Sequence, residues 1–439
     1  MPTHKDLLQA HRLMTQRSAL ALISGEPDAP DQPLRRLNLG TISGLLAAAI
    51  AAAVFAVLGL ISPGSGAGSA NGLTRAGTLA VDSASATAYV PCDGGKLCPA
   101  LNYPSALLAL DSTSVRRVTV SPSALAHYAL GPTIGIAGLP QDLPADLVKG
   151  PWAVCAAGSA TTLVGGRSVG GAAVGLGSAA LASTGQGDVW VLWNGERLAI
   201  EPTVAQTLFP AMQVQTVPAA WLNVVPQGPD FAAPHIAGLG REVTGPDGNA
   251  LVGQVFEQPG AGGAVSQYYV LLDDGKLAQI TGTQAQLLAR EPGAAAPQAI
   301  TPSVATANLS ATTVPRGGLP ATVPAVAPIR SALCMTYGSD LVGHLVTDAT
   351  VPSGATSTAA GANVWLPPGH GALLGAGATG AGGYFLVVGA TRYALPSPSV
   401  AGVLGYNLKS DSAVLPAAVL ELLPAGPALS PTAATRPAA

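Results

Sequence analysis

Residues 89–108, YVPCDGGKLCPALNYPSALL, belong to a set of four segments in this chain that align with one another without a gap. The other three are WVLWNGERLAIEPTVAQTLF from residue 190, YVLLDDGKLAQITGTQAQLL from residue 269 and FLVVGATRYALPSPSVAGVL from residue 385. Each turns on Asp, Asn or Gly between two runs of strand-forming residues, a pattern that predicts a β-hairpin. The aromatic residues that open and define the four repeats are Tyr89, Trp190, Tyr269 and Phe385.

A short helix is expected after each hairpin. A Ser, Thr or Pro precedes an apolar pair at matching positions, as a helix start requires. A second proline-led segment follows in the first, second and fourth copies, whereas the third has only a degenerate counterpart near Pro302. We therefore expect four hairpin-plus-short-helix repeats, at residues 79–140, 186–239, 263–324 and 380–430.

The segments between the repeats are irregular in length, which excludes a solenoid of fixed period. They contain further strand-like runs, and we predict that residues 141–185, 240–262 and 325–379 together build one composite, β-rich central domain. Repeats one and two are expected to emerge from one part of it and repeats three and four from another. Residues 431–439 are predicted to be a flexible tail.

Residues 40–61, GTISGLLAAAIAAAVFAVLGLI, carry no charge and are long enough to cross the hydrocarbon core of a membrane. Five basic residues precede this segment, and the next one after it is Arg75, so the positive-inside rule predicts a cytoplasmic leader at 1–39. The bulk of the chain, beyond a linker at 62–78, then lies on the extracytoplasmic side of the membrane. A cleaved signal peptide would have a shorter leader and a shorter apolar region, so an uncleaved single-pass anchor is favoured.

Four cysteines in an exported domain predict two disulfides, although counting alone leaves three pairings open. In the gapless alignment, the positions of Cys92 and Cys98 hold a large apolar residue and an alanine in the other copies. This favours a local structural disulfide across the hairpin over a metal site or a redox pair. Cys155 and Cys334 both fall in the predicted central domain, where a bridge between two pieces of a composite sheet would explain them.

The composition and the motifs provide no support for an enzyme or a nucleic-acid-binding protein. The 54 Gly and 38 Pro residues exclude a long-helix protein, and the net charge of −3, without a basic cluster beyond the leader, excludes nucleic acid as a partner. No Walker motif is present, the GxSxG at 166–170 precedes a poor helix-forming stretch, the six histidines are scattered, and Asp273 and Asp274 are expected at a hairpin tip. No catalytic, metal or cofactor residue is predicted. Each repeat also carries a basic residue seven positions after its opening aromatic. These residues are predicted to be solvated, and contact with anionic cell-wall polymer is the alternative. They are Lys96, Arg197, Lys276 and Arg392.

The chain resembles the EccB family, the single-span core component of the mycobacterial-type ESX, or type VII, secretion machine. The similarity rests on QRSALALISGEP and PLRRLNLGTISG in the leader, and on LNYPSALL at 101, GIAGLPQDLP at 135, WAVC at 152 and LCMTYG at 333. It implies an α+β fold, in which one transmembrane helix precedes a β-rich central domain flanked by four repeats. It also implies a disulfide in the central domain, at positions that Cys155 and Cys334 match.

The resemblance further implies a structural role in the secretion pore, in several copies, beside other core membrane components and an FtsK/SpoIIIE-type motor ATPase. A cell-wall-binding module is one alternative, since the family's repeat is similar to the cell-wall-binding modules of phage lysins. ATP hydrolysis is the other, since members of the family carry an ATPase label; ATP would then be the cofactor.

Overall fold

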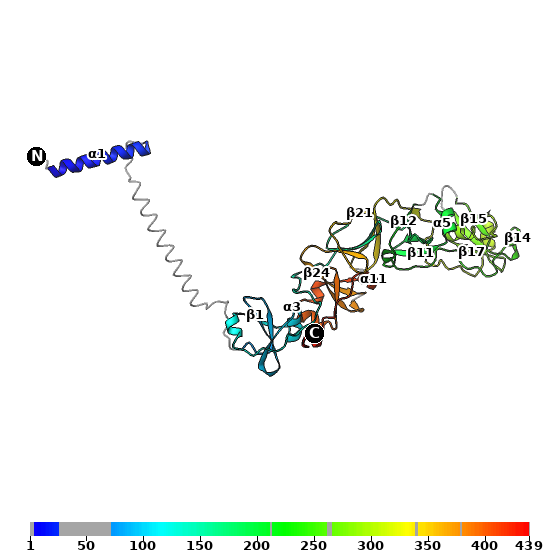
Figure 1. Cartoon of the computed structure of the whole chain (residues 1–439). Coiled ribbons are helices and arrows are strands. Elements are labelled where there is room, and N and C mark those ends of the chain that lie inside the picture. Colours follow the sequence, from blue (N-terminus) through cyan, green and yellow to red (C-terminus); the bar gives the residue numbers. More distant parts are fainter. Residues whose placement is uncertain are drawn as a thin grey trace. The chain divides into compact units, whose positions relative to one another are not determined.

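The computed structural model describes residues 4–25, 72–210, 213–260, 266–338, 341–377 and 380–438 (Figure 1). The chain divides into two compact units, residues 1–69 and 70–439. In the first unit, helix α1 (His4–Ser24) is described. The predicted membrane span at 40–61 lies outside the described residues, and within them no helix is both long and apolar enough to cross a bilayer.

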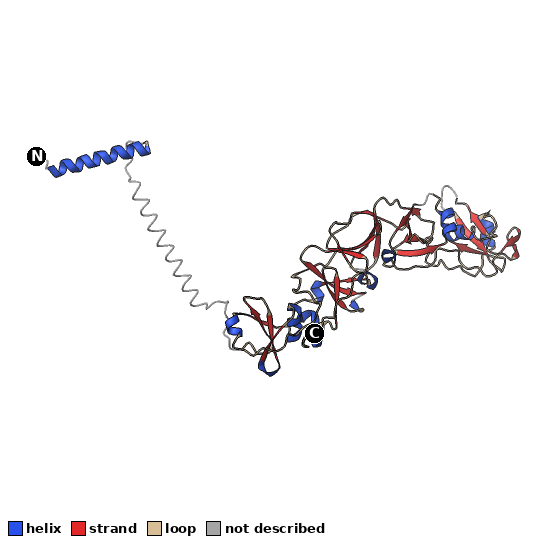
Figure 2. Cartoon of the chain, viewed as in Figure 1, coloured by secondary structure: helices blue, strands red, loops and turns tan. Residues whose placement is uncertain are grey.

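The second compact unit is α+β and rich in strands (Figure 2), and four of the sheets formed by its described residues have the same strand order. In each, the first strand in chain order pairs antiparallel with the second, and the second pairs antiparallel with the third. The fourth strand pairs parallel with the first. Helix joins the third strand to the fourth, and a second short helix follows the fourth. We call each such sheet with its helices a module and number the modules in chain order.

The bounds of the modules are as follows. Module 1 contains β1 (Thr78–Asp82), β2 (Ala88–Cys92), β3 (Lys96–Pro99), α3 (Tyr103–Leu110), β4 (Arg116–Val120) and α4 (Pro122–Leu125). Module 2 contains β9 (Ser178–Ser183), β10 (Val189–Trp193), β11 (Glu196–Ile200), α5 (Pro202–Leu208), β12 (Val214–Thr216) and α6 (Ala219–Leu222). Module 3 contains β15 (Val255–Gln258), β16 (Gln267–Leu271), β17 (Leu277–Ile280), α7 (Gly282–Leu288), β18 (Gln298–Ala299) and α8 (Pro302–Ala307). Module 4 contains β24 (His370–Ala376), β25 (Tyr384–Val388), β26 (Thr391–Leu395), α9 (Ser399–Val403), α10 (Leu408–Asp411), β27 (Ser412–Leu415) and α11 (Ala417–Leu420).

The helix after each hairpin begins where the sequence supplies a cap. Asn102 caps α3 by accepting a hydrogen bond from the Ser105 amide at 3.0 Å. Thr281 and Gln284 form a reciprocal capping box at the start of α7, which satisfies two backbone amides at once. These caps orient the helices so that their apolar residues are buried against the hairpins.

Each module has two strands more than the predicted hairpin, namely the parallel fourth strand and a strand that leads into the hairpin. In modules 2, 3 and 4 this leading strand lies in a segment that we predicted to be central, because it is β9, β15 or β24. It pairs with the strand of the opening aromatic through a loop rather than a tight turn, so no local turn signal marks the pairing. For these strands the predicted boundaries are wrong.

Two distant stretches of the chain form a seven-stranded sheet. The first provides β6 (Trp152–Ala157), β7 (Ala160–Gly165) and β8 (Ala172–Ala173), and the second provides β20 (Ala332–Tyr337), β21 (Gly343–Ala349), β22 (Thr356–Ser357) and β23 (Ala362–Trp365). The two stretches pair at three places, because β6 lies antiparallel to β20, β7 parallel to β23 and β8 antiparallel to β21. Two short strands reach from the same segments to the modules, because β5 (Asp146–Leu147) pairs with β24 and β19 (Ala325–Val326) pairs with β9.

Of the segment predicted at 240–262, the described residues 240–260 do not join the seven-stranded sheet, so their predicted place in the central domain is wrong. Strands β13 (Glu242–Gly245) and β14 (Gly248–Leu251) pair only with each other among the described residues. Val252 and Val255 are buried with Val270 and Leu272 in the core of module 3. Apolar burial against the nearest hairpin therefore decides the position of this segment.

The buried clusters show how the modules are joined. One face of the seven-stranded sheet forms a single core with modules 2 and 4, whose helices α6 and α11 contribute Trp221 and Val419. A second core joins module 1 to module 4, and a third joins module 2 to Leu287 of module 3. The expected grouping of repeats one with two and three with four is therefore wrong, since shared apolar faces group one with four and two with three.

Residues 431–438 are ordered, so the predicted flexible tail is wrong. They form α12 (Pro431–Ala434) and a short extended stretch against module 1. The Ala438 amide donates to the Thr133 carbonyl at 2.8 Å, and the Gly135 amide donates to the Arg436 carbonyl at 3.1 Å. Ala434 is fully buried in the core shared by modules 1 and 4, which holds the segment in place.

The structure contains both disulfides. Cys92 and Cys98 are joined across the hairpin of module 1, with a Cα–Cα distance of 5.8 Å. Cys155 and Cys334 lie directly opposite each other on β6 and β20, with a Cα–Cα distance of 4.0 Å. The second bridge is buried on the face of the seven-stranded sheet that is opposite modules 2 and 4.

Removing the two disulfides is expected to have unequal effects on stability. The double variant Cys155→Ala/Cys334→Ala should lower the free energy of unfolding by about 5 kcal/mol, because the bridge closes a loop across 179 residues. The matched variant Cys92→Ala/Cys98→Ala should lower it by only about 2 kcal/mol, because its bridge spans 6 residues. Urea unfolding of the full chain in detergent, followed by tryptophan fluorescence, measures both values. Equal losses would contradict this expectation.

Candidate functional site

The four recurring basic residues do not occupy one structural position. Arg197 and Arg392 lie opposite the residue two places after the opening aromatic of their hairpins. In modules 1 and 3 that place is held by Leu97 and Leu277, both fully buried. The turns of modules 1 and 3 contain one residue more than those of modules 2 and 4, so the gapless alignment is out of register after the turn. The structural equivalents of Cys98 are accordingly Leu198, Ala278 and Tyr393.

Arg197 and Arg392 are not solvated hairpin residues, which corrects that prediction for these two positions. The Arg197 guanidinium carbon lies 5.1 Å from the centroid of the Trp190 ring, and that of Arg392 lies 5.3 Å from the centroid of Phe385. In both residues the Nε atom is buried without a partner among the described residues. Burial lowers the pKa of Arg197. Lys96 and Lys276, by contrast, are exposed.

The opening aromatics are structural. Tyr269 is buried, its hydroxyl donating to Gln267 Oε1 at 2.9 Å, and Tyr89 is half-buried against Leu97 and its neighbours. The Trp190 indole donates to Asp188 Oδ2 at 2.7 Å. Burial acts to raise the pKa of Asp188, but hydrogen bonds from Thr184, Trp190 and Ser183 outweigh it and lower that pKa.

The motifs weighed for catalysis have structural surroundings. Ser168 of the GxSxG sequence lies in the loop between β7 and β8, and a strand follows it instead of the helix that a nucleophile elbow requires. Asp274 accepts hydrogen bonds from the Lys276 amide and the Ser310 hydroxyl, each at 2.9 Å, and Asp273 lies 3.9 Å from the Arg241 guanidinium. In the described part of the chain, no group of three or more His, Cys, Asp or Glu side chains is arranged to hold a metal ion.

The outer edge of each hairpin is bordered by the chain that follows the module's second short helix. We call these stretches the edge segments, at residues 129–134, 226–231, 308–313 and 424–429. In modules 1, 2 and 4 the edge segment contains Gly-Pro, one further residue, and then a large apolar residue. The glycines allow close approach: a Cβ on Gly131 would lie 2.4 Å from the Cys98 sulfur, and one on Gly426 would lie 2.5 Å from the Tyr393 ring.

The apolar residue of the edge segment closes the hairpin edge in three modules. These residues, Ile134, Phe231 and Leu429, are at most 4% exposed. Their amides donate to the third strand of the module, to the carbonyls of Pro99, Ala199 and Ala394 at 2.9, 2.7 and 2.9 Å. The sequence predictions did not include this motif, although the recurrence of Gly-Pro 38 to 42 residues after three of the opening aromatics was a usable signal.

Module 3 lacks this closure. Its edge segment reads Ser310-Ala-Thr-Thr313, and Thr313 stands where the other modules have the apolar residue. Thr313 is exposed, and among the described residues its amide donates no hydrogen bond to the Gln279 carbonyl. The Ser310 hydroxyl accepts from the Thr312 amide at 3.1 Å and donates to Asp274, and this local turn directs the chain away from β17.

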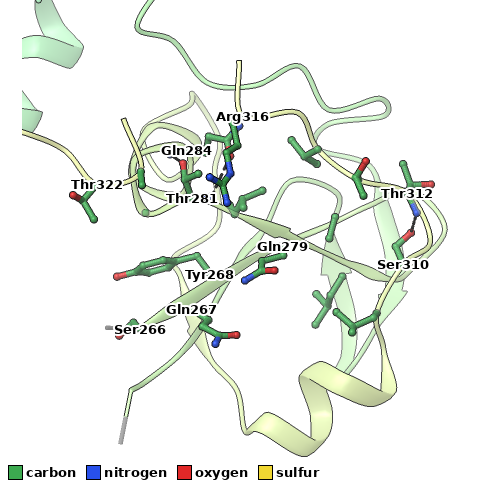
Figure 3. Close-up of a pocket in the computed structure, with 18 residues that line it drawn as sticks. Ser266, Gln267, Tyr268, Gln279, Thr281, Gln284, Ser310, Thr312, Arg316 and Thr322 are labelled. Carbon is green, nitrogen blue, oxygen red and sulfur yellow. Dashed lines mark hydrogen bonds between the residues drawn. The ribbon is translucent and has the colours of Figure 1, made fainter. Parts of the chain in front are cut away.

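A hollow of about 480 Å³ lies between β17 and the diverging edge segment. Its apolar lining includes Leu277, Ile280 and Val314, and its polar lining includes Gln267, Gln279 and Thr281. Figure 3 shows Arg316 beside Gln284 at one end of the hollow, with Ser310 and Thr312 at the other. Gln284 is held by a 2.7 Å hydrogen bond to the Pro315 carbonyl, so it braces the wall. This open edge is the most distinctive candidate binding site.

A family model described as "Type VII secretion system ESX-1, transport TM domain B" matches residues 1–438. The chain belongs to this EccB family. The ESX-2 secretion system ATPase EccB2 of Mycobacterium tuberculosis is 32% identical over 300 residues, which cover 64% of this chain and 58% of that protein. The ESX-5 secretion system ATPase EccB5 of Mycobacterium marinum is 28% identical over 317 residues, covering 67% of this chain and 60% of that protein. The chain thus spans less than two thirds of the length of these EccB relatives.

Solved EccB-type structures have the same fold. A chain from the intact ESX-5 inner membrane complex matches with a TM-score of 0.66 and 23% identity, over 100% of this chain and 96% of that one. The EccB3 dimer from the ESX-3 core complex matches with a TM-score of 0.65 and 24% identity, over 82% of this chain and 99% of that one. At these identities, the similarity establishes the fold alone.

Substitutions of Arg197 test whether this side chain has a structural role in module 2. Arg197→Leu should leave the free energy of unfolding within about 1 kcal/mol of the native value, because leucine is the residue at this place in modules 1 and 3 and removes a buried, unpaired Nε. Arg197→Ala should lower it by about 1–2 kcal/mol through loss of the contact with Trp190. Chemical denaturation compares the two variants. A larger loss for leucine than for alanine would contradict the structural role.

Proposed function

We propose that the protein is a structural core subunit of a type VII (ESX) secretion complex in the inner membrane. The observation that carries this proposal is the family match across residues 1–438, joined to the fold of chains solved within an ESX-5 inner membrane complex. Residues 40–61 form the single membrane anchor, residues 1–39 lie in the cytoplasm, and the second compact unit lies on the periplasmic side. The protein assembles there with other core components, including an FtsK/SpoIIIE-type motor ATPase, and with further copies of itself.

The four modules are the proposed assembly elements and correspond to the four repeats of the family. Their shared strand order supports this assignment, as do the core that modules 2 and 4 share with the seven-stranded sheet and the cores that join module 1 to module 4 and module 3 to module 2. Arranged in this way, the modules provide a rigid framework with several outward faces. Such a framework suits a subunit that holds partners in place.

Assembly is tested by purifying the affinity-tagged chain from its native membranes in mild detergent. The chain should elute in a large complex that contains the motor ATPase and further copies of itself. A control in which the tagged module region, residues 72–439, carries a cleavable signal sequence instead of residues 1–71 should lose the motor while remaining folded. A full-length chain that elutes alone, from cells that secrete ESX substrates, would contradict the proposal.

Two alternatives remain, because relatives are named ATPases and because cell-wall contact is an expectation from the resemblance. ATP hydrolysis by the purified full chain should not exceed that of a mock preparation, since the sequence lacks a Walker motif. A hydrolysis rate that follows the chain through two orthogonal purifications would establish the enzyme instead. Sedimentation with purified peptidoglycan, compared with unrelated exported protein of similar charge, tests wall binding in the same preparation.

A further inference from the structure

The edge of β17 is the unusual feature of the four modules. In modules 1, 2 and 4 the chain closes its own hairpin edge with a backbone hydrogen bond and a buried isoleucine, phenylalanine or leucine. In module 3 the closing residue is replaced by the exposed Thr313, and a hollow of about 480 Å³ remains. We propose that this hollow binds an extended segment of a partner protein, which pairs with β17 and inserts one large apolar side chain.

The backbone supports this mode of binding. Strand β17 is the outermost strand of its sheet, and the edge segment pairs with it at Leu277, through Asn308 and Ser310. Beyond that point the Gln279 carbonyl, which corresponds to those of Ala199 and Ala394, accepts no hydrogen bond from Thr313. Unpaired backbone groups at a sheet edge are a template for an added strand. Proteins use this mode for peptide recognition, with backbone pairing for affinity and a side-chain pocket for specificity.

The lining of the hollow selects the side chain. Ala278 and Ile280 line it and are buried in the core on one face of β17, and Val314 packs against that same core. Leu277 lines it from the strand but is buried in the core on the opposite face. The other modules place an aliphatic or aromatic side chain beside the same strand. An isoleucine, leucine or phenylalanine from outside would therefore replace the contact that Thr313 cannot make.

Charge complementarity narrows the partner further. Arg316 is the single charged residue among those that line the hollow in the described part of the chain, and it is exposed. A segment with an acidic residue next to its apolar anchor would satisfy both features. Module 2 contains such a sequence, since Asp230 precedes Phe231 in its edge segment. The partner segment is thus extended, acidic and anchored by one large apolar residue.

A peptide copied from module 2 provides the probe. Fluorescein-labelled peptide PQGPDFAA, residues 226–233, is titrated with the full chain in detergent, and binding is followed by fluorescence anisotropy. Saturable binding is expected, with at least a tenfold weaker affinity when the phenylalanine of the peptide is replaced by serine. Absence of binding up to millimolar chain, or equal binding of both peptides, overturns the proposal.

Variants of the chain locate the site. Thr313→Phe should fill the hollow from within and weaken binding at least tenfold, whereas Thr306→Phe, at an exposed position on α8 outside the hollow, should leave binding unchanged. Arg316→Glu should weaken binding of this peptide, which carries an aspartate before its phenylalanine. The same variant should strengthen binding of a peptide in which that aspartate is replaced by lysine. This charge reversal remains informative if Thr313→Phe fails to fold, as a thermal melt would show. Equal affinities in all three variants overturn the proposal.

Sedimentation velocity distinguishes a partner segment from a second copy of the chain. With a partner segment, Thr313→Phe leaves the oligomeric state of the full chain unchanged. A loss of self-association in Thr313→Phe, together with release of subunits by the peptide, would assign the hollow to another copy and overturn the partner proposal. If the chain assembles into the secretion complex but does not bind the peptide, the proposed secretion role stands and only this binding site is rejected.

Discussion

The pairing of β6 with β20 is the interaction on which the rest of the structure depends. It joins residues 152–157 to residues 332–337 and places Cys155 opposite Cys334. Between these strands, β7 and β8 remain in the same sheet, and the chain from β9 to β19, including modules 2 and 3, is an insertion into it. The cost of closing such a long loop is offset by a core on each face of the sheet and by the disulfide.

Each module has two apolar faces, and the use of these faces sets the connections among modules. In modules 2 and 4 the face that carries the opening aromatic is shared with the seven-stranded sheet, and an arginine covers the aromatic ring at its border. In modules 1 and 3 the same face is closed locally, with Leu97 or Leu277 in place of the arginine. Modules 2 and 4, which share this face with the seven-stranded sheet, have a two-residue hairpin turn. Modules 1 and 3, which close this face locally, have a three-residue turn. A difference of one residue in the turn therefore coincides with a difference in what packs against the face.

The sequence predicts the local features well and the long-range ones unevenly. Turn residues between strand formers locate the hairpins at Tyr89, Trp190, Tyr269 and Phe385, since a tight turn is encoded by adjacent residues. The leading strands β9, β15 and β24 pair through longer loops, and β9 and β24 carry small apolar residues like those in the strands of the central sheet. The register slip after the turn is invisible in a gapless alignment, because Lys96 and Arg197 match in type although not in position. The open edge at Thr313 depends on a missing apolar residue, which is apparent only beside the three closed modules.

The pairing of the last residues with module 1 has a consequence for the order of folding. Ala438 donates to Thr133, and Ala434 is buried in the core that modules 1 and 4 share, so contacts that complete the first module come from the end of the chain. During synthesis, the first module emerges long before those residues exist. Contacts of such long sequence separation form late. The first module to be made is therefore among the last to be finished, and until then its surface near residue 134 remains available to a chaperone or to an incoming neighbour.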